Sequence, residues 1–162
     1  MLFETQRLFV TKWKEDDLDS LYQLFNDPAI KECILPRLTI EETTHIFETQ
    51  LTEYDTSFPF GRYFIVEKES LEKIGLFLLK AMKDGIEIGY SLKKEHWNKG
   101  FATEIVRESI TWIQQLKKFD KVYAITGTDN TNSQNVLLKS GFTPKEDFLE
   151  NGKDIEFISK RF

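Results

Sequence analysis

A stretch of strict alternation leads into a stretch of helical periodicity near the middle of the chain. Apolar residues occupy every second position from Ile86 to Leu92, which predicts a strand with Glu87 on its opposite face. Further on, small or apolar residues recur every three or four positions, which predicts a long helix with one buried stripe: Ala102, Ile105, Val106, Ser109, Ile110, Ile113 and Leu116. Gly100 lies in the loop between this strand and this helix.

Further strands and helices are predicted on both sides of this segment. The predicted strands cover residues 8–13, 60–68, 73–80 and 121–126. The predicted helices cover residues 18–25, 39–54 and 132–140, and Thr39 and Glu42 have the spacing of a capping box. Phe148 and Leu149, followed by residues 155–158, predict a closing hairpin.

The order of these elements predicts the fold class. Short turns join the strands at 60–68, 73–80 and 86–92, which predicts an antiparallel meander. The long helix separates strand 86–92 from strand 121–126, so these two strands are expected to pair in parallel through a crossover. The expected fold is α/β (α+β), a mixed, mostly antiparallel twisted sheet with helices on both faces, in one domain over residues 1–162.

Composition and charge exclude several classes of protein. The chain has 162 residues, 40% hydrophobic and 30% charged, as is typical of a globular protein. A formal net charge of −5 without a dense basic cluster argues against a nucleic-acid surface. Cys33 is the only cysteine, which excludes an internal disulfide and favours a reducing compartment. No stretch approaches the length of an apolar membrane span, so we expect a cytoplasmic protein without a membrane partner.

Gly100 is a candidate anion-binding position. The first N–H groups of a helix have no intrahelical partner, and the helix dipole favours negative charge there. A glycine at this point lets a phosphate or pyrophosphate approach closely. Alternatively, the glycine has a conformational role alone, as it has in many strand-to-helix turns. The flanking residues form neither a Walker loop nor a Rossmann fingerprint.

Three motifs occur in order along the chain. They are Glu4-Thr-Gln-Arg-Leu8, Trp97-Asn-Lys-Gly-Phe-Ala102 and the segment from Asn130 to Phe142. Together they resemble the GNAT family of acetyl-CoA-dependent N-acetyltransferases, whose main motif is Arg/Gln-x-x-Gly-x-Gly/Ala. The form with Trp97 in place of Arg or Gln is similar to that of the RimJ/RimL-like branch, the ribosomal-protein-alanine acetyltransferases. The resemblance implies a GNAT fold and acetyl-CoA as acyl donor.

The resemblance also implies which residues contact acetyl-CoA. They come from the central strand, the loop, the start of the long helix and the segment after residue 129: Tyr90, Leu92, Trp97, Asn98, Lys99, Gly100, Phe101, Ala102, Thr103, Asn130 and Ser133. Asn132 departs from the small residue usual between the family's Asn and Ser. Alternatively, Thr131, Asn132 or Ser133 caps the short helix that follows.

Acyl transfer from a thioester to an amine requires that the amine lose a proton and that the thiolate leave. An α-amine, with a reference pKa of about 8, needs less help from a base than a lysine at about 10.4. The resemblance implies Glu87 as the base, directly or through water, and Ser133 as the acid for the departing thiolate. Tyr90 and Tyr123 are reserve acids. Glu87 fits a surface strand glutamate equally well.

The histidines and the acceptor complete the expectations. Neither His45 nor His96 has a metal-ligand partner at a useful sequence spacing, so no metal is expected. The expected reaction is direct attack in a ternary complex, with a protein N-terminal α-amine as acceptor. A small-molecule amine (polyamine, amino acid or antibiotic) and a non-catalytic CoA-binding sensor or scaffold remain alternatives. Candidate acceptor-wall residues are Cys33, Ile34, Leu35, Pro36 and Arg37, and we expect a monomer or homodimer.

Overall fold

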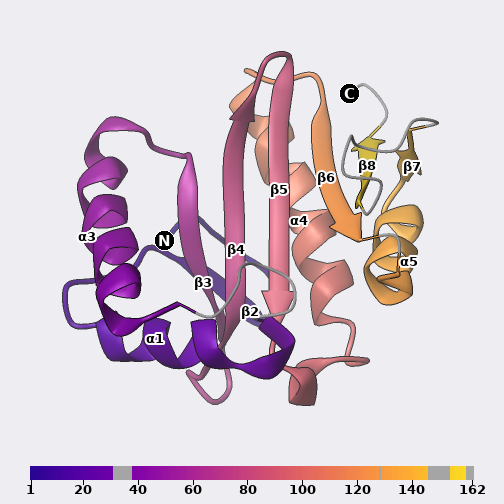
Figure 1. Cartoon of the computed structure of the whole chain (residues 1–162). Helices are drawn as coiled ribbons and strands as arrows, with labels where there is room; N and C mark the ends of the chain where they lie inside the picture. Colours follow the sequence, from indigo (N-terminus) through magenta and orange to yellow (C-terminus); the bar gives the residue numbers. More distant parts are fainter. Residues whose placement is uncertain (31–37, 128, 146–153, 160–162) are drawn as a thin grey trace. The chain divides into compact units, whose positions relative to one another are not determined.

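The strands and helices of the computed structural model follow the predicted order (Figure 1). The structure describes residues 1–30, 38–127, 129–145 and 154–159, the last segment as backbone only. The chain divides into two compact units, Met1–Leu79 with Tyr90–Phe101 and Lys80–Gly89 with Ala102–Phe162. A single domain over residues 1–162 stays a prediction.

The first unit contains an antiparallel meander. Its strands follow the order β1-β2-β3-β4, which are Phe3–Glu4, Leu8–Thr11, Gly61–Glu67 and Lys73–Met82, with β4 belonging to this unit as far as Leu79. The predicted strands in these regions are confirmed, and β4 extends two residues beyond its predicted end at residue 80. We did not predict β1, because two residues carry no periodic pattern.

Two helices pack against each other in the first unit, α1 (Leu18–Asn26) and α3 (Ile40–Thr56). The predicted capping box begins α3: the Glu42 N–H donates to Thr39 Oγ1 at 3.1 Å, and the Thr39 N–H donates to Glu42 Oε2 at 2.7 Å. Trp13 stacks on Phe47 with ring centroids 6.0 Å apart and lies 5.8 Å from Phe64. Aromatic packing therefore joins α3 to β3 in the core of this unit.

The second unit contains the predicted crossover. β5 (Gly85–Leu92), which belongs to this unit as far as Gly89, and β6 (Val122–Gly127) pair in parallel, with Ile86 opposite Val122. The helix α4 (Phe101–Leu116) connects them along the chain. Its predicted stripe is buried, since four of its residues have an exposed fraction of 0%: Ile105, Val106, Ser109 and Ile113. The alternating and helical patterns thus identified this strand–helix–strand segment correctly.

The C-terminal part of the second unit adds α5 (Thr131–Lys139), β7 (Phe142–Pro144) and β8 (Asp154–Ser159). β8 pairs antiparallel with both β6 and β7, so the strand order is β5-β6-β8-β7. The sequence predicts a closing hairpin with Phe148 and Leu149 in its first arm. These two residues lie outside the described residues. The predicted fold class is confirmed: a mixed α/β fold in which most strand pairs are antiparallel and β5–β6 is parallel.

Candidate functional site

The predicted anion-binding loop lies at the end of β5 in the first unit. A short 3-10 helix, η1 (Lys94–His96), follows the strand, and α4 begins at Phe101 directly after Gly100. The Trp97 ring donates from Nε1 to the Leu92 carbonyl at 2.9 Å, which ties the start of the loop to the end of the strand. Trp97 to Gly100 are exposed, so their backbone is accessible to a ligand.

Two residues of this loop have left-handed backbone conformations. Asn98 has φ 57° and Gly100 has φ 80°. Asn tolerates this region better than most residues, and glycine adopts it without steric cost. Among the described residues other than its chain neighbours, a Cβ built on Gly100 would meet the Arg7 Nη2, at 3.4 Å. The loop therefore turns sharply into the N-terminus of α4 and offers an anion both space and a neighbouring positive charge.

Arg7 is bound to this loop by two contacts. Its Nη1 donates to the Lys99 carbonyl at 3.0 Å, and its guanidinium lies 4.4 Å from the centroid of the Phe101 ring. Phe101 is only 4% exposed, so the ring is a fixed platform for the arginine. Arg7 belongs to the opening motif, but the sequence assigns it no role. No local pattern indicated one, because the two partners are 92 positions apart.

The opening Thr-x-Arg-Leu motif forms the turn that positions Arg7. Thr5 Oγ1 accepts hydrogen bonds from the Leu8 N–H at 2.9 Å and the Arg7 N–H at 3.3 Å. The Thr5 N–H donates to the Leu8 carbonyl at 2.9 Å, which closes the turn between β1 and β2. The threonine is 7% exposed, so its hydroxyl replaces water as the partner of these amides. The motif therefore has a structural role as well as a diagnostic one.

The strand β5 carries the candidate base and two predicted donor contacts. Glu87, which belongs to the second unit, is 9% exposed and lies opposite Tyr123 of β6. A surface strand glutamate, the alternative from the sequence, is not what the structure shows. Tyr90 is half-buried and Leu92 is 6% exposed, and both belong to the first unit. Burial of an acidic side chain is rare and draws attention to Glu87.

Asn130 and Ser133 lie at the start of α5 in the second unit. The Asn130 Oδ1 accepts a hydrogen bond from the Ser133 N–H at 3.1 Å, so Asn130 is the N-cap. The capping residue is therefore not Thr131, Asn132 or Ser133, the three considered from the sequence. Ser133 is half-buried in the first turn of the helix. Ala102 and Thr103, also in the second unit, are half-buried in the first turn of α4.

Tyr123, a reserve acid, has a structural partner for its hydroxyl. The hydroxyl donates to Asp84 Oδ1 at 2.7 Å, and Lys121 Nζ donates to the other carboxylate oxygen at 2.6 Å. These two hydrogen bonds, that of Lys121 first, hold the pKa of Asp84 below its usual range. Asp84 lies in the turn between β4 and β5, so Tyr123 helps to fix this turn.

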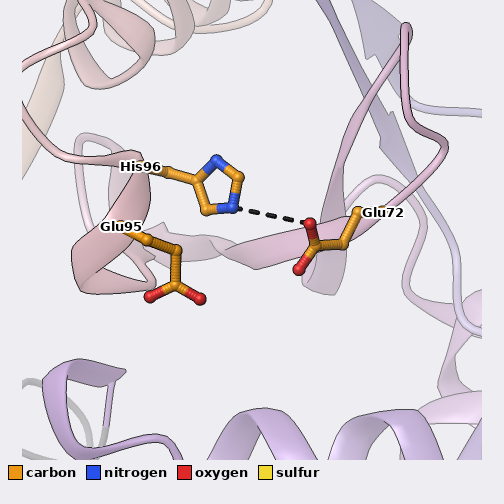
Figure 2. Close-up of side chains that lie close together, drawn as sticks. All are labelled: Glu72, Glu95 and His96. Carbon is orange, nitrogen blue, oxygen red and sulfur yellow. Dashed lines mark ion pairs between the residues drawn. The ribbon is translucent and has the colours of Figure 1, made fainter.

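The two histidines differ in their surroundings. His45 is exposed on α3, whereas His96 is 7% exposed and its Nε2 lies 3.7 Å from Glu72 Oε2. Sequence spacing missed this pair because Glu72 is in the turn between β3 and β4. Together with Glu95, these side chains form the one group of potential metal ligands in the described part of the chain (Figure 2).

The predicted acceptor wall, Cys33 to Arg37, lies outside the described residues.

The sequence and the fold of this chain are both similar to those of known acetyltransferases. A profile of the acetyltransferase (GNAT) domain matches residues 7–143. The chain is 28% identical over 145 residues to the uncharacterized N-acetyltransferase YoaA of Bacillus subtilis (strain 168), covering 87% of this chain and 82% of YoaA.

Two solved acetyltransferases have a similar fold. One is RimL, a ribosomal-protein α-N-acetyltransferase in complex with coenzyme A (TM-score 0.79, 17% identity, 98% of this chain and 97% of that one). The other is a chimera of the spermidine N-acetyltransferase SpeG from Vibrio cholerae (TM-score 0.73, 17% identity, 96% of both chains).

In the described part of this chain, no helix combines the length and apolar character that crossing a membrane requires.

Proposed function

Since the chain belongs to the acetyltransferase (GNAT) domain family and is an N-acetyltransferase, we propose that it transfers the acetyl group of acetyl-CoA to a protein N-terminal α-amine. The family uses acetyl-CoA, which supplies the acyl group as an activated thioester. The proposal assigns binding of the donor's phosphates to the loop that ends at Gly100. It assigns proton transfer to Glu87 and Ser133.

One observation supports donor binding most strongly. Gly100 has φ 80°, the Arg7 guanidinium lies near the position of its Cβ, and α4 begins at the next residue. Backbone N–H groups at a helix N-terminus attract anions, and an arginine beside them adds a full positive charge. These groups fit a pyrophosphate, and the absence of a side chain at Gly100 permits its close approach.

In the proposed reaction the amine nitrogen bonds to the acetyl carbon while the thioester C–S bond breaks. Glu87 takes the proton that the amine loses, directly or through a water, and Ser133 gives a proton to the departing CoA thiolate. Burial of Glu87, at 9% exposure, supports a role that a surface glutamate would not need. Tyr90 is the reserve acid on the same strand.

The choice of an α-amine acceptor rests on chemistry and on similarity. About a tenth of an α-amine with a pKa near 8 is already neutral at pH 7, so a single modest base suffices. Similarity of fold to RimL supports a protein N-terminus, and similarity to SpeG supports a polyamine as second candidate. The protein N-terminus is therefore the first candidate, and a direct comparison of the two acceptors distinguishes them.

An acceptor screen tests the proposal. CoA release by the unmodified protein is followed with a thiol reagent, and a blank without acceptor corrects for the one protein thiol, Cys33. The panel contains peptides with free N-terminal Ala or Ser, the same peptides already N-acetylated, spermidine, free amino acids and amine antibiotics. Mass spectrometry locates the acetyl group on each product.

The expected result is acetylation of the free N-terminus and none of the blocked peptide. Turnover of spermidine alone would replace the proposed acceptor by a polyamine. Binding of acetyl-CoA without turnover of any amine would favour the CoA-binding sensor, and absence of acetyl-CoA binding would overturn the assignment of the loop.

A further inference from the structure

A histidine and two glutamates lie close together in the first unit. Glu72 precedes β4, and Glu95 and His96 belong to η1. One donor atom from each lies within 4.8 Å of the other two. Figure 2 shows the Nε2 edge of the imidazole turned toward Glu72, with the Glu95 carboxylate on the same side of the ring.

The His96 side chain is buried but incompletely satisfied. It is 8% exposed, its Nε2 lies 3.7 Å from Glu72 Oε2, and its Nδ1 has no hydrogen-bond partner among the described residues. A separation of 3.7 Å is longer than a hydrogen bond. The ring lies 6.2 Å from the Phe101 ring, which helps to hold its orientation. The Nε2 edge of this buried imidazole therefore faces the Glu72 carboxylate at a distance longer than a hydrogen bond.

The spacing fits a metal ion. Nitrogen and oxygen donors bind Zn²⁺ at about 2.0–2.2 Å, so two donors on one tetrahedral ion are about 3.4 Å apart. The separation between His96 and Glu72 is already near this value. Glu95 is exposed, so its side chain can rotate to close the remaining distance. Only side-chain adjustment is needed.

Charge in the cluster is compatible with a cation. The two carboxylate oxygens of Glu72 face different groups. Oε1 accepts a hydrogen bond from Lys93 Nζ at 2.7 Å, and Oε2 faces His96. Oε2 therefore remains available to a metal ion. The Lys93 ammonium also opposes a cation, so binding should be weaker than at a closed structural zinc site.

We propose that Glu72, Glu95 and His96 form a binding site for a divalent first-row metal ion, with Zn²⁺ as the best match. One imidazole and two carboxylates are ligands that Zn²⁺ accepts, and three protein ligands leave one position for water. A bound ion would join the turn between β3 and β4 to the segment immediately before Trp97. The site does not depend on the proposed acceptor or on the roles of Glu87 and Ser133.

Calorimetric titration with ZnCl₂ tests the site in the Cys33→Ser protein, where no thiol competes. One saturable site is expected, with a rise in Tm on addition of Zn²⁺ and no comparable effect of MgCl₂. Glu95→Gln and His96→Gln should each weaken Zn²⁺ binding more than about tenfold, since even changes in the groups around metal ligands cost about that much. Glu95 is exposed, so its variant remains informative if His96→Gln fails to fold.

His45→Gln and Glu69→Gln are matched controls. His45 is the other histidine and Glu69 is an exposed glutamate in the same turn as Glu72, and neither belongs to the cluster. Both variants should bind Zn²⁺ like the parent protein. Absence of saturable binding by the parent, or an unchanged affinity in Glu95→Gln, overturns the site. An equal loss of Zn²⁺ affinity in His45→Gln also overturns the site, because it would mean that Zn²⁺ binds to scattered surface ligands.

Discussion

Arg7 donates a hydrogen bond from Nη1 to the backbone carbonyl of Lys99 at 3.0 Å. The C=O and N–H of a trans peptide point in opposite directions, so this contact turns the Gly100 N–H away from Arg7. The guanidinium also stacks on the ring of Phe101, the first residue of α4. One exposed side chain thus fixes both the loop and the start of the helix that follows it.

Arg7→Ala should raise the KM for acetyl-CoA about tenfold with a smaller effect on kcat, because a charge-assisted hydrogen bond to the loop is lost. Arg7→Lys should recover only part of the lost acetyl-CoA affinity. A lysine ammonium is not planar, so it cannot donate the hydrogen bond and stack on Phe101 at the same time. Steady-state kinetics and calorimetry measure the effects. Arg107→Ala is the control, because Arg107 is also exposed and donates to the Lys139 carbonyl at 3.2 Å. Equal effects of the two alanine variants would contradict a specific role for Arg7.

Gly100→Ala should weaken acetyl-CoA binding, and Gly100→Glu should abolish it, because a side chain occupies the space assigned to the anion. Gly141→Ala controls for backbone strain, since Gly141 has φ 90° and a Cβ there would meet no atom of the described residues within 4 Å. Each alanine should cost about 1 kcal/mol of stability through its left-handed conformation. Only the change at Gly100 should alter calorimetric affinity. An unchanged affinity in folded Gly100→Glu would refute the placement of the site.

Glu87→Gln and Ser133→Ala should lower kcat much more than acetyl-CoA affinity, because both proposed roles are in proton transfer. Loss of the acid should cost about one to two orders of magnitude, since a thiolate is a tolerable leaving group. For an α-amine acceptor, kcat/KM should rise with pH and level off near about 8. The Glu87→Gln rate should recover partly at high pH, where neutral amine is abundant. A wild-type profile in this variant would remove Glu87 from the mechanism.

Asn130 offers a way to separate helix capping from cofactor binding. Asn130→Ala should lower stability by about 1 kcal/mol, because the Ser133 N–H loses its acceptor. Asn130→Asp keeps a capping oxygen but removes the amide NH₂, so it should restore stability. If the amide also contacts acetyl-CoA, the aspartate variant should still bind the donor weakly. Full affinity in a stable aspartate variant would limit Asn130 to capping. Denaturant unfolding and calorimetry give the two readouts.

Asp84→Asn should lower the Tm near neutral pH, because Asp84 accepts hydrogen bonds from Lys121 and Tyr123. These contacts lower the pKa of Asp84 in the folded state, so they stabilise the fold above the ordinary pKa of the carboxyl. The stabilisation is lost as the pH falls through the lowered value. The difference in Tm between parent and variant should therefore shrink in acid. Asp120→Asn, at an exposed aspartate, should show no such pH dependence.

Much of the local structure was predictable because its causes are local. Alternation identified β5, a helical stripe identified α4, and the spacing of Thr39 and Glu42 identified the start of α3. Each signal arises from backbone geometry repeated over a few residues. The position of Gly100 between a strand and a helix was also predictable, because the alternating pattern ends before it and the helical stripe begins after it. Short strands such as β1 and β7 were not predicted, because two or three residues are too few to show a hydrophobic period.

The tertiary structure alone decided which side chains meet across long stretches of sequence. Arg7 contacts Lys99, and Glu72 lies beside His96, because neighbouring strands and turns bring together segments with no shared periodicity. Burial of Glu87 likewise depends on what packs over its face of β5, which alternation cannot specify. Sequence patterns report the conformation of each segment. Partners between segments depend on sheet register and turn geometry, which are properties of the whole fold.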